Sequence, residues 1–444
     1  MSERTTLIRG GHVVDPSGSV DAKLDVLVRE GRIIEVAPKI DKDRAQRIIK
    51  AKGLIVAPAF IDLHTHLREP GGESSETIAT GARAAAMGGF ARIFCMPNTS
   101  PVCDSPVAVK QVLDRAREAC GVRVYPVASV SRGMSGEQLT DFGALLRDGA
   151  GAFSDDGLPV ANAEVMRSAL ECTRDIGAVI FDHCEDLSLT GAGVMHEGEV
   201  ALRLGLKGIP RVSETAIVLR DCALSLATGG RLHVCHVSNS ESVEAVRHFK
   251  SRGAPVTAEV SPHHLLFTHE RVGAYDTHAK MKPPLCEESD RQALIAALED
   301  GTIDCIATDH APHAPALKAD TFDHAPFGII GMETAFASLH TAFVMTGRWS
   351  LAFLIEKMTA APARVMAREA GENPWGTLRV GAEADVVLLD VEQEYEMSLE
   401  HLGSRSRNCP WLGQRLRGRA VCTMVGGRVI HVEADRIAGV AATA

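Results

Sequence analysis

The sequence predicts a (β/α)8 TIM barrel joined to a small β domain that is built from both ends of the chain. Eight short apolar runs recur between about residues 58 and 374, and helix-like segments separate most of them. Strand-like runs and turns occupy the residues on either side of that region. The length of 444 residues is too great for one ordinary domain and suits a barrel with a smaller second unit.

The first segment, residues 1–57, alternates short β patterns with turns. Turn signals D-P-S-G at 15–18 and E-G at 30–31 separate strand-like runs, which is typical of a small antiparallel unit. Residues 375–444 repeat this style in LRVGAEADVVLLD and AVCTMVGGRVIHVE. Isolated strands need partners, so we expect the two ends to form one discontinuous β-sandwich domain beside a barrel of residues 58–374.

The middle region supplies eight candidate barrel strands. In chain order they are APAFIDLH, GFARIFCMP, VRVYPVAS, GAFSDD, AVIFDHC, RLHVCHVS, APVTAEVS and TIDCIATDH. Helix-like segments between them include residues 105–120, 162–177 and 240–253. The alternative is an open doubly wound sheet, which usually carries a Gly-rich phosphate loop after its first strand. No such loop follows the first run, so the barrel is favoured.

Composition excludes several classes of function. The formal net charge of −10 argues against nucleic-acid binding, which needs a dense basic surface. No stretch approaches the roughly 18 consecutive apolar residues of a membrane helix, and the start of the chain lacks a signal-peptide pattern. Eleven cysteines are scattered without a C-x-x-C pair, as expected for reduced thiols. We therefore expect a cytoplasmic protein with no membrane or nucleic-acid partner.

Residue types that bind metals lie at the C-terminal ends of the apolar runs, where barrel enzymes place their active sites. Run one ends with His64 and His66, and the two-residue period of a strand points both rings the same way. Runs four, five, six and eight end with further candidates, namely Ser154 with Asp155 and Asp156, His183, His236, and Asp309 with His310. Several histidines and carboxylates converging on one mouth are typical of a zinc site that is open to water.

Other eye-catching residues have a structural explanation. A His-x-His pair alone is mostly chance, and its partners at four other strand ends are what favour metal binding. His263 and His264 are adjacent, so at most one faces the mouth, and structural hydrogen bonds are expected for them. Cys184 and Cys235 flank candidate ligands, and strand alternation predicts that both face away, into the layer between barrel and helices.

Longer motifs carry a family resemblance. In order, they are FIDLHTHLREPGG (60–72), MPNTSPV (96–102), FSDDG (153–157), HCED (183–186), CHVS (235–238), TAEVSPHHLL (257–266), TDHAPH (308–313) and APFGIIGMETAF (325–336). Together they resemble the amidohydrolase superfamily and, within it, the bacterial type I dihydroorotases. The motifs span nearly the whole chain, and the combination of HLREPGG with TDHAPH is specific.

The resemblance implies two Zn2+ ions per subunit. The ligands that it implies are His64, His66, Asp156, His183, His236 and Asp309. The first two histidines and Asp309 would hold the first ion, and the other two histidines would complete the second. Asp156 would bridge both ions, where many relatives use a carboxylated lysine. An aspartate bridge can hold the second ion weakly.

The resemblance also implies a reaction: reversible cyclisation of N-carbamoyl-L-aspartate to L-dihydroorotate, the third step of pyrimidine biosynthesis. The substrate contacts that it implies are His66, Arg68, Asn98, Lys282, His313, Phe327 and Gly328. Arg68, Asn98 and His313 would fix the substrate carboxylate, and the backbone at 327–328 would contact the ring. Asp309 would act as general base and then as general acid. A homodimer is expected, and association with aspartate transcarbamoylase is an open alternative.

Two positions depart from the family pattern. Where the family reads Asn-Pro-Pro-Leu-Arg, this chain has Lys282 at the first position and Cys286 at the last. Lysine has donors but no acceptor, so it cannot copy the contact of an amide. Either Lys282 pairs with a substrate carboxylate, or it turns to solvent and another group serves.

Two rival functions follow. Allantoinase or hydantoinase/dihydropyrimidinase substrates lack the ring carboxylate, so Arg68 and the aspartate at 156 favour dihydroorotate. A catalytically inactive scaffold of aspartate transcarbamoylase would lack metal ligands, and here every ligand position is filled.

Overall fold

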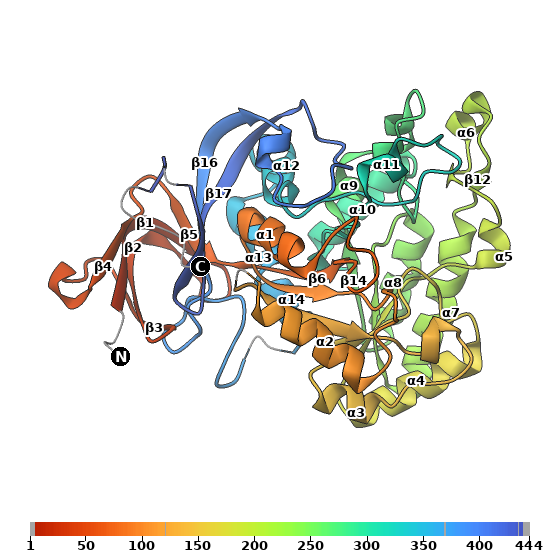
Figure 1. Ribbon diagram of the computed structural model, residues 1–444, viewed down its shortest axis with the longest axis horizontal. Helices are drawn as coiled ribbons and strands as arrows, with labels where there is room; N and C mark the ends of the chain where they lie inside the picture. Colours follow the sequence, from red (N-terminus) through yellow and green to blue (C-terminus); the bar gives the residue numbers. More distant parts are fainter. Residues whose placement is uncertain (1–4, 120, 368–369, 434, 438–444) are drawn as a thin grey trace.

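The structure is a computed structural model, and it describes residues 5–119, 121–367, 370–433 and 435–437. A β-sheet from both ends of the chain lies at one end of the molecule, and a barrel with its helices fills the rest (Figure 1). The predicted architecture is therefore confirmed. The domain bounds 1–57, 58–374 and 375–444 stay a prediction, and their outermost residues, 1–4 and 438–444, lie outside the described part.

Eight parallel strands form the barrel, one for each predicted apolar run. In spatial order they are β6 (Phe60–Thr65), β7 (Phe90–Cys95), β8 (Arg123–Ala128), β9 (Ala152–Phe153), β10 (Val179–Asp182), β13 (Arg231–Val234), β14 (Val256–Val260) and β15 (Cys305–Ile306). A parallel bridge between Thr65 and His310 brings the last strand back to the first. The backbone N–H of His66 donates to the His310 carbonyl at 2.8 Å, so the closure lies at the proposed metal site.

Helices cover the outside of the barrel. They are α1 (Ile78–Gly88), α2 (Pro106–Arg117), α3 (Phe142–Arg147), α4 (Ala163–Asp175), α7 (Val212–Thr228), α8 (Ser240–Ser251), α10 (Glu288–Asp300), α13 (Leu351–Met358) and α14 (Ala360–Val365). Local sequence explains their limits: in α8 the Asn239 side chain caps the backbone N–H of Ser242. The same helix buries Val243, Val246 and Phe249 at helical spacing. The helices predicted at 105–120, 162–177 and 240–253 are α2, α4 and α8, and residue 120 lies outside the described part.

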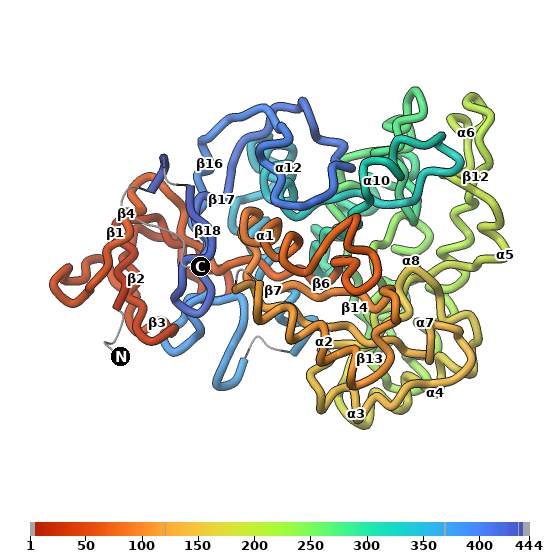
Figure 2. The backbone as a smooth tube through the Cα atoms, in the orientation of Figure 1, coloured from red at the N-terminus to blue at the C-terminus, as the bar shows by residue number. Residues whose placement is uncertain are grey.

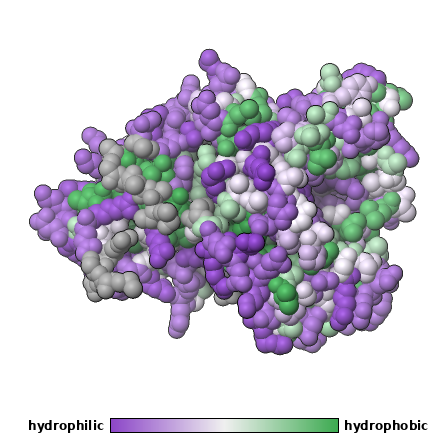
Figure 3. Space-filling view, viewed as in Figure 1, coloured by the Kyte–Doolittle hydropathy of each residue, from purple (hydrophilic) through white to green (hydrophobic). Residues whose placement is uncertain are grey.

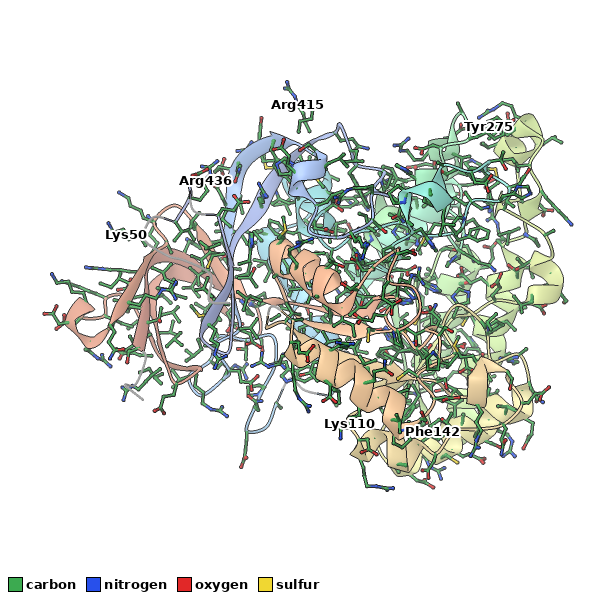
Figure 4. The ribbon with its side chains drawn as sticks, viewed as in Figure 1. Lys50, Lys110, Phe142, Tyr275, Arg415 and Arg436 are labelled. Carbon is green, nitrogen blue, oxygen red and sulfur yellow. The ribbon has the colours of Figure 1, made fainter. Side chains whose placement is uncertain are left out.

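Shorter elements lie in the connections that follow the barrel strands. After β10 the chain forms α5 (Leu187–Thr190), β11 (Met195–His196), α6 (Glu199–Leu204) and β12 (Gly208–Ile209), and later come α9 (Pro262–Leu266), α11 (Pro315–Lys318) and α12 (Ala335–Leu339). Tyr275 lies beside α6 (Figure 4), and its hydroxyl donates to the Leu204 carbonyl at 2.7 Å. Among the described residues no helix has both the length and the apolar character needed to cross a bilayer.

The terminal sheet joins both ends of the chain. Its strands are β1 (Thr5–Asp15), β2 (Val20–Arg29), β3 (Arg32–Ala37), β4 (Arg47–Lys50), β5 (Ile55–Pro58), β16 (Val386–Glu396), β17 (Arg415–Val425) and β18 (Arg428–Val432). Antiparallel pairing of β5 with β16 joins the two ends. The N-terminal unit is not wholly antiparallel as predicted, because β1 pairs in parallel with β4 and β5. Turn signals predict pairing only between strands that follow each other in the sequence, and β1 is not followed directly by β4 or β5.

The connection between β16 and β17 leaves the sheet and passes over the barrel beside α12 (Figure 2). Its backbone is anchored there: the Arg83 guanidinium on α1 donates to the Gly403 carbonyl at 2.7 and 2.9 Å. The face seen in Figure 3 is mostly hydrophilic, with apolar residues in small separate groups. The C-terminal part of the chain thus contributes both to the sheet and to the surroundings of the barrel mouth.

Candidate metal centre

Six buried side chains converge at the barrel mouth, and they are the six that the sequence predicts: His64, His66, Asp156, His183, His236 and Asp309. Asp156 lies at their centre. Its Oδ1 is 3.3 Å from His64 Nε2, 3.4 Å from His183 Nδ1 and 3.5 Å from His236 Nε2. Its Oδ2 is 3.4 Å from His66 Nε2. One carboxylate therefore reaches all four imidazoles, as a bridging ligand must.

Asp309 faces the first histidine pair. Its Oδ1 lies 3.2 Å from His66 Nε2 and 3.5 Å from His64 Nε2. On the other side of Asp156, His183 Nδ1 and His236 Nε2 approach each other to 3.0 Å. The six side chains thus form two groups that share one carboxylate.

The spacing of these atoms fits a metal better than a hydrogen-bonded cluster. Ligands at about 2.0–2.2 Å from one tetrahedral ion lie roughly 3.3 Å apart, whereas charged N–H···O bonds are about 2.7–2.9 Å long. Two buried atoms, His64 Nε2 and Asp156 Oδ1, have no hydrogen-bond partner of acceptable geometry. Unpartnered buried polar atoms are costly unless another group satisfies them. The donor set of imidazoles and carboxylates suits Zn2+.

Three of the histidines are oriented through their other ring nitrogen. His64 Nδ1 lies 2.7 Å from Glu259 Oε1, and His66 Nδ1 lies 3.0 Å from Asn98 Oδ1. His183 Nε2 lies 3.2 Å from Glu185 Oε2. Such contacts fix the tautomer and ring orientation of metal-binding histidines. Asn98, predicted to contact substrate, therefore also orients His66.

The electrostatics of the centre keep its carboxylates ionised. Burial alone would raise the pKa of Asp156, but the surrounding histidines outweigh it and hold that pKa well below the usual range. Asp309 behaves alike: burial opposes ionisation, and His64 and His66 lower its pKa. Burial would lower the pKa of His183, whereas Asp156 and Glu185 raise it to about 9. The site is therefore a place where positive charge is strongly favoured, as a cation site requires.

Backbone strain also gathers here. Among the described residues eight that are not glycine have positive φ, and three belong to the site: Arg68 at 59°, His236 at 33° and Asp309 at 46°. Left-handed conformations cost roughly 1–3 kcal/mol for such residues, and they persist where the surroundings enforce them. In each case the kink follows a barrel strand and turns a functional side chain into the mouth.

The predicted carboxylate contacts lie together beside the metal centre. Arg68 Nε donates to the Pro312 carbonyl at 3.1 Å, and its Nη2 lies 3.4 Å from His313 Nε2. Burial lowers the pKa of Arg68 to about 10, which leaves it charged at neutral pH. Burial and the charges of Arg68 and Lys318 lower the pKa of His313 to about 3, so this imidazole is neutral.

The backbone that is predicted to contact the ring lies next to the same histidine. His313 Nε2 lies 2.6 Å from the Phe327 carbonyl. Gly328 has φ 152°, and a Cβ there would lie 2.7 Å from His313 Cδ2 and 2.5 Å from the Ala311 carbonyl oxygen. Only glycine fits this position.

Lys282 takes an arrangement that neither sequence alternative included. Its Nζ lies 3.0 Å from Glu185 Oε1 and 5.4 Å from the centre of the Phe327 ring. Glu185 in turn contacts His183, so the lysine is paired with a protein carboxylate at the edge of the centre. Its contact with substrate stays a prediction.

One sequence expectation about the neighbouring cysteines was wrong. Cys235 does not face the helix layer: it lies within ligand distance of His64 and Glu259 and joins an apolar cluster with Leu63 and Phe181. Strand β13 ends at Val234, and the left-handed His236 breaks the alternation on which the expectation depended.

The remaining expectations about these neighbours are confirmed. Cys184 clusters with Val218 and Cys222 of α7, on the helix side of the strands. His263 and His264 are both buried and both contact Ser261 Oγ, at 2.8 and 2.6 Å. These are the structural hydrogen bonds expected for the histidine pair.

Comparison with known proteins gives the family. A family model described as Dihydro-orotase-like matches residues 53–242. A curated protein from Anaeromyxobacter dehalogenans, named Dihydroorotase, is 50% identical over 433 residues, covering 97% of this chain and 99% of that protein. The chain belongs to the dihydroorotase family. A Dihydroorotase from Citrifermentans bemidjiense is 44% identical over 425 residues, covering 96% of this chain and 99% of that protein.

Solved structures place the dihydroorotase-family chain in a wider fold group. L-hydantoinase (dihydropyrimidinase) from Arthrobacter aurescens superposes with a TM-score of 0.86 at 23% identity, over 96% of each chain. Dihydropyrimidinase from Brevibacillus agri NCHU1002 gives 0.81 at 23% identity, over 96% of this chain and 95% of that one. At this identity the likeness concerns the fold.

Sequence reasoning missed several residues around this site. Glu259 had a weak signal, because it is a lone carboxylate inside the apolar run APVTAEVS. Asn408 had none, since it lies in an irregular segment far from the ligand motifs, and Lys318 had none, since no motif marks the short helix α11 in which it lies. Both contact the carbonyl of Gly328, at 3.0 Å each.

Proposed function

We propose that the protein is an active dihydroorotase, which cyclises N-carbamoyl-L-aspartate to L-dihydroorotate in pyrimidine biosynthesis and opens the ring in reverse. The position of Arg68 supports this reaction most directly. Dihydroorotate carries a carboxylate beside the ring amide that is opened, and a guanidinium binds a carboxylate through two hydrogen bonds. Arg68 lies beside the metal centre and 3.4 Å from His313. A carboxylate bound by Arg68 would therefore lie next to the reacting atoms.

We propose that the centre holds two Zn2+ ions, with the six residues acting as the sequence resemblance implies. Asp156 supports a shared bridge because its carboxylate contacts histidines of both groups. When bound, zinc lowers the pKa of water and polarises the carbonyl to be attacked.

Asp309 would move the proton. Its lowered pKa keeps it ionised, so it can accept a proton from the attacking water. The same carboxyl would then donate that proton to the departing ring nitrogen. In the biosynthetic direction it would take a proton from the ureido nitrogen that closes the ring. Neutral His313 would help to hold the carboxylate, and the backbone at Phe327 and Gly328 would hold the ring, while this occurs.

A hydantoinase or dihydropyrimidinase activity is the second candidate, because proteins of those names share the fold. Their substrates lack the ring carboxylate and would leave Arg68 without an anionic partner. An inactive scaffold is disfavoured, since all six ligand positions carry ligand residues.

A substrate panel tests the proposal. Purified zinc-loaded protein would be offered dihydroorotate, N-carbamoyl-L-aspartate, allantoin and dihydrouracil in parallel, with bound metal measured. We expect interconversion of the first pair only, with about two zinc ions per chain. Turnover of allantoin or dihydrouracil without dihydroorotate would overturn the assignment, and no turnover at all would favour the scaffold.

Assembly and location stay predictions of the same kind. A homodimer in the cytoplasm is expected, and light scattering of the purified protein measures its mass. Co-purification with aspartate transcarbamoylase tests the proposed association.

A further inference from the structure

A single amide from the C-terminal part of the chain joins two parts of the proposed substrate pocket. Asn408 lies in the connection between β16 and β17, and its side chain is 1% exposed. Its Nδ2 donates to the carbonyls of Ala311 at 2.9 Å and Gly328 at 3.0 Å. Its Oδ1 accepts from the backbone N–H of His313 at 3.2 Å. Both donor hydrogens and one acceptor site of the amide are therefore used.

These contacts match the chemistry of asparagine and of no smaller side chain. Two carbonyl oxygens need donors, and one N–H needs an acceptor, within reach of one short side chain. An amide supplies two donors and an acceptor, whereas aspartate supplies acceptors only. The backbone of Asn408 also takes part, because its carbonyl accepts from the N–H of Ile330 at 3.0 Å.

The two segments that Asn408 joins belong to different parts of the proposed substrate-binding site. Residues 311–313 carry His313, which lies beside the carboxylate-binding Arg68. Residues 327–330 carry the backbone proposed to contact the ring. The packing between these segments is tight, because a Cβ on Gly328 would lie 2.5 Å from the Ala311 oxygen. A small change in their separation would therefore alter how carboxylate and ring are held together.

We propose that Asn408 is a positioning residue of the active site: it sets the distance between the carboxylate-binding His313 and the ring-binding backbone of Gly328. The amide touches no reacting atom and acts through these two segments. This role deepens the proposed function and rests on it, because it concerns the binding of a ring that carries a carboxylate. It also gives the β16–β17 connection a part in substrate recognition.

Substitution of Asn408 tests this role. Asn408→Asp keeps the shape but sets carboxylate oxygens against two carbonyls, and Asn408→Ser keeps one donor and one acceptor. We expect the KM for dihydroorotate to rise about tenfold or more, which is about 1.4 kcal/mol or more of binding free energy, because the carboxylate-binding and ring-binding segments would no longer be held at the right separation. We expect kcat to fall less than this, and zinc content to stay at the wild-type level.

Ser406→Ala is the matched control from the same connection. Ser406 is fully buried, and its Oγ donates to the Ser75 carbonyl at 2.7 Å. The Ser406→Ala variant thus loses one buried hydrogen bond, and this bond does not involve residues 311–313 or 327–330. A merely structural role for Asn408 predicts that both kinds of variant lower the melting temperature and neither changes KM selectively. If Asn408→Asp fails to fold, Asn408→Ser gives the KM measurement.

Two further measurements, orotate binding by each variant and dihydroorotate turnover by the wild type, separate the possible outcomes. Binding of orotate, the unsaturated analogue with the same carboxylate, is measured calorimetrically in each variant, and its Kd should rise as KM does. Unchanged KM and orotate Kd in the Asn408 variants, or an equal rise in Ser406→Ala, would overturn the positioning role. Wild-type protein that does not turn over dihydroorotate would instead overturn the proposed function. The turnover assay on wild-type protein tests this separately from the comparison of variants.

Discussion

At the scale of single residues, the two ring nitrogens of His64 lie in different surroundings. Nε2 faces Asp156 and Asp309 in the metal centre, and Nδ1 lies 2.7 Å from Glu259. The other Glu259 oxygen lies 3.0 Å from His233 Nε2, so this carboxylate is held between two histidines inside the barrel. Burial would raise the pKa of Glu259, but the two histidines lower it to about 2. An ionised carboxylate therefore fixes His64 with Nε2 free to bind a metal.

Glu259→Gln should weaken metal binding without removing a ligand. The amide keeps an acceptor but loses the charge that supports His64, and such changes typically cost about 10–100-fold in metal affinity. Competition with a zinc chelator measures this affinity. Glu214→Gln is the control, because Glu214 is also buried and its hydrogen bonds go to Ser238. Equal zinc affinity in wild type and Glu259→Gln would contradict the orienting role.

Arg68→Met should separate substrate binding from metal binding. Methionine fills similar space but cannot bind a carboxylate, so kcat/KM for dihydroorotate should fall by about 100-fold or more, given charge-assisted hydrogen bonds of roughly 1.5–3 kcal/mol each. Bound zinc, measured by elemental analysis, should not change. Arg68→Lys keeps the charge without the planar fork, and we expect an intermediate loss. Loss of zinc in Arg68→Met would count against a role confined to the carboxylate.

The sequence predicts the ligand residues better than the residues that support them. His64 and His66 follow a recognisable apolar run, and the strand end explains why they meet Asp309. Glu259 gives only a one-residue signal, and Asn408 gives none. Its contacts depend on the path of the β16–β17 connection, which has no periodic pattern. Supporting side chains that lie in irregular segments are therefore the part of the site that sequence patterns do not predict.

At the scale of elements, the segment that follows the metal ligands is held by buried amines. Lys318, in α11, donates to the carbonyls of Pro326 at 2.9 Å and Gly328 at 3.0 Å. Lys280 donates to the carbonyl of Asp323 at 3.1 Å and contacts that of Phe322. Burial lowers the pKa of Lys318 to about 7 and that of Lys280 to about 8. Backbone carbonyls thus accept hydrogen bonds from both amines, and the charges of Asp276 and Asp323 partly oppose the effect of burial on the pKa of Lys318 and Lys280, respectively.

Lys318→Met should change stability in a pH-dependent way. The folded-state pKa of about 7 lies below the usual lysine pKa of about 10.5, so the unfolded chain binds more protons between these pH values. Wild-type stability therefore gains from this group as pH rises from about 7 to about 10.5, and the full cost of burying a charge is present below 7. The variant removes that cost. The difference in melting temperature between variant and wild type should therefore be roughly 3 °C larger at pH 6.5 than at pH 9.5.

Lys110→Met serves as the control for this comparison, because Lys110 is exposed on α2 and points outward (Figure 4). It should show no such pH dependence. The Lys318 variant should also raise the KM for dihydroorotate, since the carbonyl of Gly328 loses one of its two hydrogen-bond donors. A melting-temperature difference that is equal at both pH values would refute the buried-charge explanation.

The barrel strands were predictable as elements because each is a short apolar run bounded by polar residues. Parallel pairing of β1 with β4 and β5 was not, since it joins segments that no turn connects. The same limit applies to the closure of the barrel, where a single bridge links Thr65 to His310. Local pattern specifies the element, and long-range packing specifies its partner.

At the scale of the whole molecule, the terminal sheet and the barrel share apolar core. One buried cluster contains Val387 and Leu389 of β16, Ala420 of β17, and the barrel residues Phe60 and Phe90. Sheet strands also pair across the two chain ends, through β5 and β16. Part of the apolar surface of each is buried only against the other, which makes independent folding of the two parts unfavourable.

The chain should therefore unfold in one cooperative transition, measured by differential scanning calorimetry of the metal-loaded protein. Leu389→Ala removes a fully buried side chain at the shared core and should cost about 2–5 kcal/mol, lowering the whole transition without splitting it. Leu219→Ala, on the exposed face of α7, should change stability by less than about 0.5 kcal/mol. Two resolved transitions in wild type, or a Leu389→Ala profile in which only a minor part shifts, would mean that sheet and barrel are separate folding units. A single transition would explain how Asn408, from the C-terminal part, can hold the substrate pocket of the barrel in place.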